Sequence, residues 1–357
     1  MNWRKKLTLS LYQQHKNTRT KLHELNYLFW ECTLRCNFGC LHCGSDCTKE
    51  AEVPDMAMQD FLNVLDNIAP HVDTKKTMIV LTGGEPTVRK DLEICGREIY
   101  KRKFPWGMVT NGYGLTAERL NSLLDAGLRS ITVSLDGHNA EIHDWFRGKN
   151  GSFSRAVDAI SNVAKTPDLV YDVVTCVNKK TIYNLDKIKD LLLSLGVTHW
   201  RLFTIFPKGR AKDNPLLKLS SDEFLHLMEF IKTTRQEGKI HVSYGCEGYL
   251  ADYEMEVRDA PYFCQAGVHI GSVLANGDIS ACPSLRGDYI QGNIYKDDFW
   301  TVWNTRYQIM RDRSWTKTSK CATCKSYKYC QGNGLHLRDE KTGDLLHCHL
   351  EMMGILH

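Results

Sequence analysis

The sequence predicts an α/β protein in which a partial (β/α)6 TIM-like barrel is followed by a small cysteine-rich domain. Between about residues 26 and 210, six short apolar runs that favour strands alternate with segments of helical periodicity. This alternation indicates a parallel sheet with right-handed crossovers, and six units are too few to close an eight-unit barrel. Residues 240–357 hold seven of the fourteen cysteines and few long periodic segments, which is typical of a region folded around metal.

Each predicted strand is a short run rich in β-branched and aromatic residues. The first, YLFWE, leads directly into a loop with three cysteines, and the next three end in the polar motifs GGEP, TNG and SLDG. The strands are expected at residues 27–31, 77–82, 106–111, 130–137, 170–178 and 199–206. Functional loops of such barrels follow the C-terminal ends of the strands, so these motifs are expected to meet at one edge of the sheet.

Helical periodicity marks the segments between the strands. Helices are expected at residues 91–102, 116–127, 154–164 and 184–196, with a bridging helix at 220–238. Gly127 is a suitable C-terminal stop for the second of these helices. We divide the chain into an N-terminal extension (1–25), the partial barrel (26–215), the bridging helix (216–239) and the cysteine-rich domain (240–357).

The composition is that of a soluble globular protein, with 42% hydrophobic and 25% charged residues among 357. No apolar run approaches the roughly 18 residues of a membrane span, and the basic start lacks the apolar core of a signal peptide. We therefore expect a cytoplasmic protein that does not bind a membrane. The net charge of +4 is small and spread along the chain, which does not favour a nucleic-acid partner. Cytoplasmic cysteines stay reduced, so metal explains them better than disulfides.

Three cysteines, Cys36, Cys40 and Cys43, lie close together in the loop after the first strand. Their spacing would also place three buried thiols on one face of a helix, but Asn37 and Gly39 make this segment a poor helix. A second alternative is a zinc site, which would need Cys32 or Cys47 as a fourth thiolate; otherwise both are structural thiols. A third is a cubane iron–sulfur cluster. Three thiolates leave one of its four irons open to bind another group.

The C-x3-C-x2-C loop and the motifs that follow it resemble the radical S-adenosylmethionine (SAM) superfamily. Only the residue before the last cysteine, His42, departs from the usual aromatic residue. The resemblance implies a 4Fe–4S cluster on Cys36, Cys40 and Cys43, with SAM bound through its methionine amino and carboxylate groups to the open iron. An electron from the cluster then cleaves SAM to methionine and a 5′-deoxyadenosyl radical, which abstracts a substrate hydrogen.

The same resemblance implies the residues that hold SAM. Gly83, Gly84 and Glu85 would receive the methionine amino group. Short polar side chains at the next strand ends would reach the ribose hydroxyls or the carboxylate; these are Asn111, Ser134 and Asp136. Arg147 is a suitable partner for the SAM carboxylate, because guanidinium pairs with carboxylate bidentately. The segment FPKGRA (206–211) is expected on the adenine side.

The C-terminal cysteines resemble the SPASM domain, which carries auxiliary 4Fe–4S clusters in many radical SAM enzymes. The resemblance implies one cluster with four thiolates, from Cys321, Cys324, Cys330 and Cys348. It implies a second cluster on Cys246, Cys264 and Cys282, whose expected fourth cysteine is replaced by Gly334. His336 substitutes there, or one iron is open, or the cluster is absent, so one or two auxiliary clusters are expected. A zinc ribbon is the structural alternative.

Enzymes with this domain mostly modify peptides or proteins, so a peptide or protein substrate is expected. Sulfatase maturation is disfavoured, because Pro283 stands where the sulfatase maturases carry an aspartate base. A small-molecule cofactor precursor is an alternative substrate, and a non-catalytic iron–sulfur electron carrier is an alternative of another class. The resemblance also implies a flavodoxin- or ferredoxin-type reductant. The first 25 residues are too few for a leader-peptide-binding domain, so that task would fall to a separate protein or to the barrel.

Overall fold

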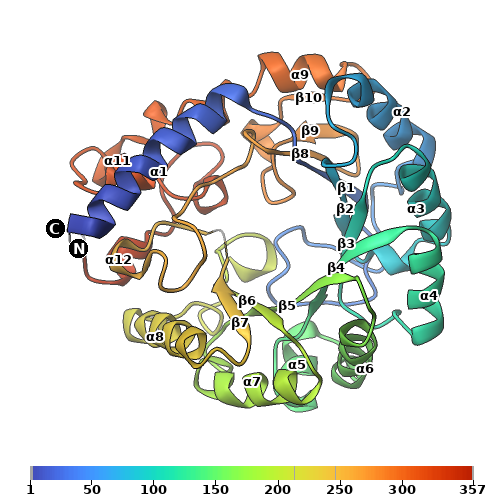
Figure 1. Ribbon diagram of the computed structural model, residues 1–357, viewed down its shortest axis with the longest axis horizontal. Coiled ribbons are helices and arrows are strands. Elements are labelled where there is room, and N and C mark those ends of the chain that lie inside the picture. Colours follow the sequence, from blue (N-terminus) through green and yellow to red (C-terminus); the bar gives the residue numbers. More distant parts are fainter. Residues whose placement is uncertain (1–2, 213, 246, 356–357) are drawn as a thin grey trace.

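The fold is an open ring of parallel strands with helices on its outer side (Figure 1). The computed structural model describes residues 3–212, 214–245 and 247–355. Its single sheet has ten strands in the order β10-β9-β8-β1-β2-β3-β4-β5-β6-β7. The seven strands from β1 to β7 pair in parallel with their neighbours in chain order. The predicted fold class, a partial and unclosed α/β barrel followed by a cysteine-rich region, is confirmed.

All six predicted strands are present. They are β1 (Tyr27–Thr33), β2 (Met78–Gly83), β3 (Trp106–Thr110), β4 (Leu128–Ser134), β5 (Val170–Cys176) and β6 (His199–Phe203). Their burial explains the near-continuous apolar runs of the sequence, since strands of a parallel sheet are covered on both faces.

Four further strands come from the cysteine-rich region of the chain: β7 (His241–Tyr244), β8 (Ile270–Val273), β9 (Asp278–Ser280) and β10 (Gly292–Asn293). The strand β8 pairs in parallel with β1, and β9 and β10 follow it in antiparallel pairs. The cysteine-rich region therefore continues the barrel sheet at both of its edges. Sequence periodicity missed these strands because each is only two to four residues long.

The larger helices of the barrel lie between its strands: α2 (Met58–Ile68), α3 (Leu92–Lys101), α4 (Ala117–Asp125), α5 (Ala140–Arg147), α6 (Ser152–Ala164), α7 (Leu185–Ser194) and α8 (Ser221–Glu237). Five of them were predicted, and α2 and α5 were missed. The bridging helix α8 begins at a capping box, in which the Ser220 side chain and Glu223 satisfy each other's backbone N–H groups. The C-terminal region adds α9 (Phe299–Thr305), α10 (Gln308–Arg311), α11 (Tyr327–Cys330) and α12 (His349–Met352).

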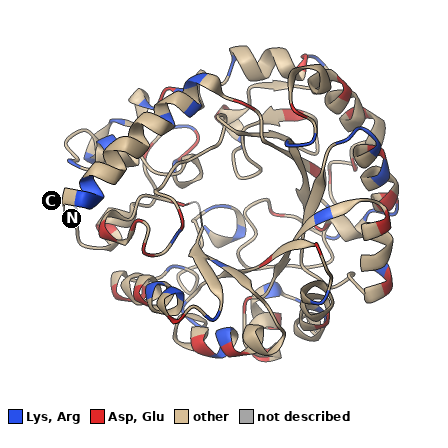
Figure 2. Cartoon of the chain, in the orientation of Figure 1, with Lys and Arg blue, Asp and Glu red and all other residues tan. Residues whose placement is uncertain are grey.

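The N-terminal extension forms one long helix, α1 (Trp3–Leu22), which the sequence did not predict. It carries six basic and no acidic residues, and it lies beside α11 at the cysteine-rich side of the ring (Figures 1 and 2). Only Leu9 and Lys16 of this helix are buried. Without an apolar stripe, its periodicity gave no signal of a packed helix.

The core lies between the sheet and the outer helices. The indole of Trp30 on β1 stacks on the ring of Phe61 from α2, with centroids 4.4 Å apart and planes 3° apart. No helix in the described part of the chain is long and apolar enough to span a bilayer.

Candidate functional site

Most of the predicted SAM-site residues line one cavity of about 160 Å³ at the carboxyl ends of the barrel strands. The lining includes the three thiols of the loop after β1, the turn after β2, and polar residues after β3 and β4. The predicted residues among them are Cys36, Cys40, Cys43, Gly83, Gly84, Glu85, Asn111, Ser134 and Arg147. Segments more than 100 residues apart in sequence thus meet at the edge where functional loops of parallel barrels gather.

The turn after β2 is clamped onto the start of the cysteine loop. The backbone N–H of Gly84 donates to the carbonyl of Thr33 (2.8 Å), and that of Glu85 donates to the carbonyl of Arg35 (3.0 Å). A Cβ on Gly83, whose φ is 126°, would lie 2.1 Å from the Thr33 oxygen, and one on Gly84 would lie 2.1 Å from the Arg35 oxygen. Both glycines are therefore needed for the close approach of two backbones.

Glu85 joins this turn to the end of β3. Its carboxylate accepts hydrogen bonds from the Thr87 and Thr110 hydroxyls (both 2.7 Å) and from the backbone N–H of Asn111 (2.7 Å). The side chain is 1% exposed, and burial raises the pKa of this carboxyl. These bonds fix the relative position of two loops that line the cavity.

Asn111 also contacts the cysteine loop directly. Its Nδ2 donates to Oδ1 of Asn37 (2.8 Å), and its Oδ1 accepts from the backbone N–H of Tyr113 (3.0 Å). Ser134, at the end of β4, is 7% exposed and lines the cavity. The loops after β1, β3 and β4 are thus brought together as the sequence suggested.

Asp136 has a different place from the one that we expected. It is fully buried and is not part of the cavity lining. One carboxylate oxygen pairs with Nε of Arg147 and the other accepts from the backbone N–H of Cys176 (2.7 Å). Burial alone would lower the pKa of Arg147, but the charge of Asp136 keeps this pKa above its ordinary value. Asp136 holds Arg147 beside Cys40, with Nη1 of Arg147 3.8 Å from the Sγ of Cys40.

Arg210, which the sequence did not single out, supports the cysteine loop from the FPKGRA segment. Its Nε donates to the carbonyl of Cys40 (2.8 Å) and its Nη1 to that of Cys47 (2.9 Å). A Cβ on Gly209 would lie 2.3 Å from the Cys43 oxygen, so this segment packs directly against the loop. The Gly-Arg pair within FPKGRA is the only sequence signal for this contact, and from the sequence we expected that segment on the adenine side of SAM.

Cys47, which we expected to be a structural thiol, lies in the cavity lining next to Cys43. Its backbone N–H donates to the Cys43 sulfur (3.4 Å). Hydrogen bonds from Cys47 lower the pKa of Cys43 to about 5, whereas burial raises the pKa of Cys36 to about 12. The hydrogen bonds from Cys47 and the charge of Arg210 favour thiolate at Cys43.

The donor set of the cavity fits an iron–sulfur cluster better than a single ion. In the described part of the chain, no three His, Cys, Asp or Glu side chains converge closely enough to hold one metal ion. Tetrahedral zinc needs that convergence. A cubane binds each thiolate to a different iron and keeps the sulfurs further apart.

The four-thiol group of the C-terminal region is built around buried donors. Cys330 accepts a hydrogen bond from the backbone N–H of Asn333 (3.2 Å), and Cys321 accepts one from the guanidinium of Arg338 (3.5 Å). Arg338 is 1% exposed and also donates to the carbonyls of Gly332 and Gly343. Donors aimed at sulfur stabilise thiolates and so suit metal-bound cysteines. The other two members of this group are Cys324, partly exposed, and Cys348, buried.

The second predicted group is only partly visible. Cys246 lies outside the described residues, and Cys264 and Cys282 are partly exposed. Gly334 packs against His336, because a Cβ there would lie 2.6 Å from the imidazole Cε1. The backbone N–H of Gly334 donates to the carbonyl of Glu247 (3.2 Å). His336 thus lies beside the residue after Cys246, and its role as a ligand stays a prediction.

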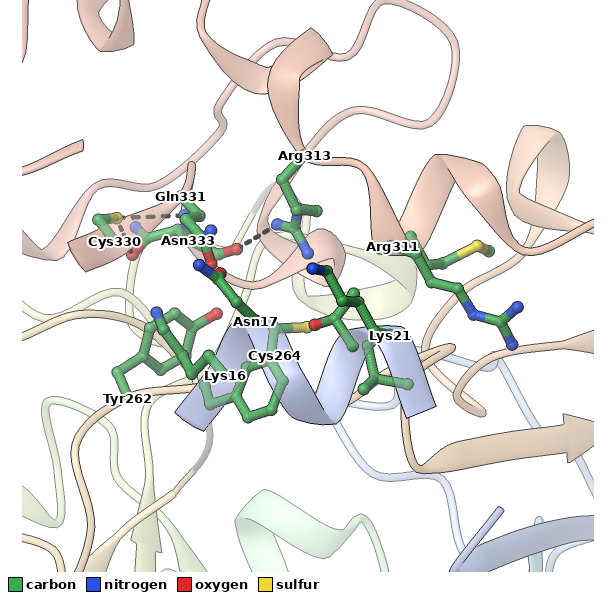
Figure 3. Close-up of a pocket in the computed structure, with 14 residues that line it drawn as sticks. Lys16, Asn17, Lys21, Tyr262, Cys264, Arg311, Arg313, Cys330, Gln331 and Asn333 are labelled. Atoms are coloured by element: carbon green, nitrogen blue, oxygen red, sulfur yellow. Dashed lines mark hydrogen bonds between the residues drawn. The ribbon is translucent and has the colours of Figure 1, made fainter. Parts of the chain in front are cut away.

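A cavity of about 220 Å³ separates α1 from the cysteine-rich region (Figure 3). Lys16 of α1 and the thiols Cys264 and Cys330 all line it. Lys16 is 3% exposed, and its ammonium donates to the carbonyl of Tyr329 (2.9 Å). Burial lowers the pKa of Lys16 to about 8, and the negative charge of Cys330 acts in the opposite direction. The N-terminal helix therefore brings a buried cation to the auxiliary thiols.

Glu31 and Arg286 connect the cysteine loop to the C-terminal region. Glu31, on β1, is 1% exposed and pairs with Arg286. The backbone N–H of Ala275 donates to Oε2 of Glu31 (3.0 Å), and Arg286 also donates to the hydroxyl of Ser45 (3.0 Å). The buried carboxylate of Glu31 thus has both the Arg286 cation and the Ala275 N–H as partners. These contacts join β1 and the cysteine loop to the C-terminal region.

Comparison with known proteins agrees with this geometry. Residues 30–192 match the radical SAM superfamily, and residues 264–325 match SPASM, an iron–sulfur cluster-binding domain. The AdoMet-dependent heme synthase of Methanosarcina barkeri is 27% identical over 320 residues, which cover 85% of this chain and 89% of that protein. The mycofactocin maturase MftC of Mycolicibacterium smegmatis is 27% identical over 314 residues, which cover 85% of this chain and 76% of MftC.

Solved structures share the fold. Streptococcus suis SuiB bound to S-adenosylmethionine superposes with a TM-score of 0.69 at 16% identity, over 89% of this chain and 76% of SuiB. Native anSMEcpe with bound AdoMet gives a TM-score of 0.72 at 17% identity, over 93% of this chain and 95% of anSMEcpe. These structures show the fold, and the two domain matches show that the chain is a radical SAM enzyme with a C-terminal SPASM domain, whose cofactors are SAM, a 4Fe–4S cluster and auxiliary iron–sulfur clusters.

Proposed function

We propose that this enzyme takes a hydrogen atom from a peptide or protein substrate at the cavity after β1. The observation that carries the proposal is the convergence of Cys36, Cys40 and Cys43 with the turn after β2 and with Arg147 around one cavity. When bound there, the reduced 4Fe–4S cluster supplies the electron that cleaves SAM into methionine and the 5′-deoxyadenosyl radical.

The hydrogen bonds around the cavity divide the proposed work among its residues. The backbone N–H groups of Gly84 and Glu85 are committed to the cysteine loop. An amino group is a donor, so the carbonyls of Gly83 and Gly84 are proposed as acceptors for the methionine amino group. Arg147 is proposed to bind the methionine carboxylate, with Asp136 as the residue that positions it.

Two substrate classes have support from the relatives. The similarity to mycofactocin maturase supports a peptide. The comparable similarity to AdoMet-dependent heme synthases supports a second candidate, a tetrapyrrole or similar cofactor precursor. An apolar pocket of about 380 Å³, lined by residues that include Ile205, Pro207, Leu217 and Leu346, is within the size range of small-molecule sites. A flavodoxin- or ferredoxin-type reductant and a separate leader-binding protein remain parts of the proposal.

Replacing Cys36, Cys40 or Cys43 by Ala should abolish formation of 5′-deoxyadenosine from SAM under dithionite without oxygen. Each variant removes one of three proposed cluster ligands, whereas the core of the barrel is ordinary apolar packing. The matched control is Cys95→Ala, which changes a fully buried thiol in α3, away from the cavity. Chromatography of the products measures the outcome. Cleavage at the wild-type rate in all three variants would refute the assignment of this loop.

The substrate class should be decided by isotope transfer. Small peptides encoded beside the gene, prepared with deuterium, should pass deuterium into 5′-deoxyadenosine, because the radical abstracts hydrogen directly from its substrate. Mass spectrometry of the nucleoside measures the transfer. Transfer from a deuterated iron porphyrin, and from none of the peptides, would replace the peptide proposal by the second candidate.

Gly84→Ala should lower the iron content of the reconstituted protein by about four atoms per chain while the fold persists. The new Cβ would collide with the Arg35 carbonyl, a backbone atom that cannot move without shifting the cysteine loop. The control is Gly39→Ala within the same loop, because nothing lies within 4 Å of a Cβ there. Iron analysis and circular dichroism measure the two effects. Equal iron in both variants would contradict the proposed fit of the turn to the loop.

Lys16→Met should make the auxiliary cluster near Cys330 harder to reduce. Reduction adds negative charge, which the buried ammonium stabilises. At a fixed potential we expect the ratio of reduced to oxidised cluster to fall about tenfold. This corresponds to a decrease of about 59 mV in the reduction potential of a one-electron couple. Lys16→Arg keeps the charge and should keep the potential, as should Lys6→Met on the exposed side of α1. A redox titration followed by electron paramagnetic resonance tests this, and an unchanged potential in Lys16→Met would contradict it.

A further inference from the structure

One face of the molecule is strongly cationic. Besides the six basic residues of α1, the segment 311–328 carries six more and a single acidic residue, Asp312. The two segments lie side by side, since α1 packs against α11 (Figures 1 and 2). Lys21, Lys317, Lys325 and Lys328 are exposed, and within the described residues none of them is in an ion pair with a carboxylate. We call α1 together with residues 311–328 the cationic face.

Some charges of this face form ion pairs within the protein, since Lys5 pairs with Glu256 and Arg19 with Glu24, but several of its lysines do not. Lys328 lies over the ring of Tyr329 (4.8 Å), and Lys317 lies over that of Tyr327 (5.8 Å). In contrast, Lys320 in the same segment pairs with Glu351. Like charges left without partners repel one another and destabilise the folded chain. An anionic partner would remove that cost.

The cationic face includes part of the four-thiol group, since Cys321 and Cys324 lie within residues 311–328. Lys325 follows Cys324, which is partly exposed, and Lys328 and Tyr329 lead into Cys330. Lys16 continues the positive charge inward. Its ammonium donates to the carbonyl of Tyr329, the residue before Cys330, and Lys16 and Cys330 line the same cavity (Figure 3). A four-thiolate cluster has no open iron for a substrate. Electron exchange is the chemistry that remains for it.

We propose that the cationic face is the docking site for an acidic one-electron donor protein of the flavodoxin or ferredoxin type. Encounters between redox proteins use small interfaces guided by charge, and this face brings such a donor next to redox-active thiolates. For each SAM cleaved, the donor is oxidised by one electron and the carbon–sulfur bond of the sulfonium breaks. An RNA or an anionic membrane would fit the charge but would gain nothing from the thiols beneath. The proposal rests on the proposed function.

The test compares two charge-reversal variants of the full-length, cluster-loaded enzyme. The first carries Lys21→Glu, Lys325→Glu and Lys328→Glu on the cationic face. The matched control carries Lys165→Glu, Lys187→Glu and Lys239→Glu, which are also exposed but lie on or beside α6, α7 and α8. Each is driven by a reduced acidic ferredoxin, by a reduced flavodoxin and by dithionite, and 5′-deoxyadenosine is measured at low and high salt.

The first variant should lose at least tenfold in rate with either protein donor at low salt and keep its rate with dithionite. The control should match the wild type with every donor, and high salt should slow only the reactions driven by proteins. Equal rates of the first variant and the wild type with the protein donors would overturn the docking site. The docking site would also be overturned if the wild type bound RNA or anionic vesicles but bound neither the ferredoxin nor the flavodoxin. No cleavage by the wild type even with dithionite would instead refute the proposed function.

Discussion

Two backbone carbonyls, those of Thr33 and Arg35, set the geometry on which the site depends. They accept the N–H groups of Gly84 and Glu85, and this joins the loop after β1 to the turn after β2. The parallel pairing of β1 and β2 ends at the same two segments, with Thr33 opposite Gly83. A side chain at either glycine would separate the loops, so the requirement for two glycines comes from contact between backbones before any ligand is considered.

Buried or half-buried cations accompany both groups of thiols. Arg147 and Arg210 contact the cysteine loop, and each is held by an aspartate, Asp136 or Asp46. At the auxiliary group, Arg338 and Lys16 are held mainly by backbone carbonyls. Carbonyl partners leave the full positive charge uncompensated, whereas aspartates neutralise part of it. The auxiliary thiols therefore lie in the more positive surroundings, which favour electron storage there.

The sequence was sufficient for the features that repeat or that carry distinctive residues. Six strands and five helices follow from apolar runs and helical periodicity, and most residues of the cavity lining follow from the family resemblance that the strand-end motifs carry. The strands β7 to β10 were missed because they are too short to show a period. The helix α1 was missed because it has no apolar stripe, with only Leu9 and Lys16 buried. The roles of Asp136 and Arg210 could not be predicted without the fold. Asp136 pairs with Arg147, 11 residues away, and Arg210 donates to the carbonyl of Cys40, 170 residues away.

We propose that an iron held by Cys36, Cys40 and Cys43 binds SAM through the methionine amino and carboxylate groups of SAM. Electron–nuclear double resonance on the reduced enzyme, with SAM labelled with nitrogen-15 at the amino group, tests it most directly. We expect a hyperfine coupling from the labelled nitrogen that is present in the wild type and lost in Arg147→Ala or on removal of SAM. A reduced cluster at full occupancy that shows no coupling to the label, with SAM bound, would contradict it.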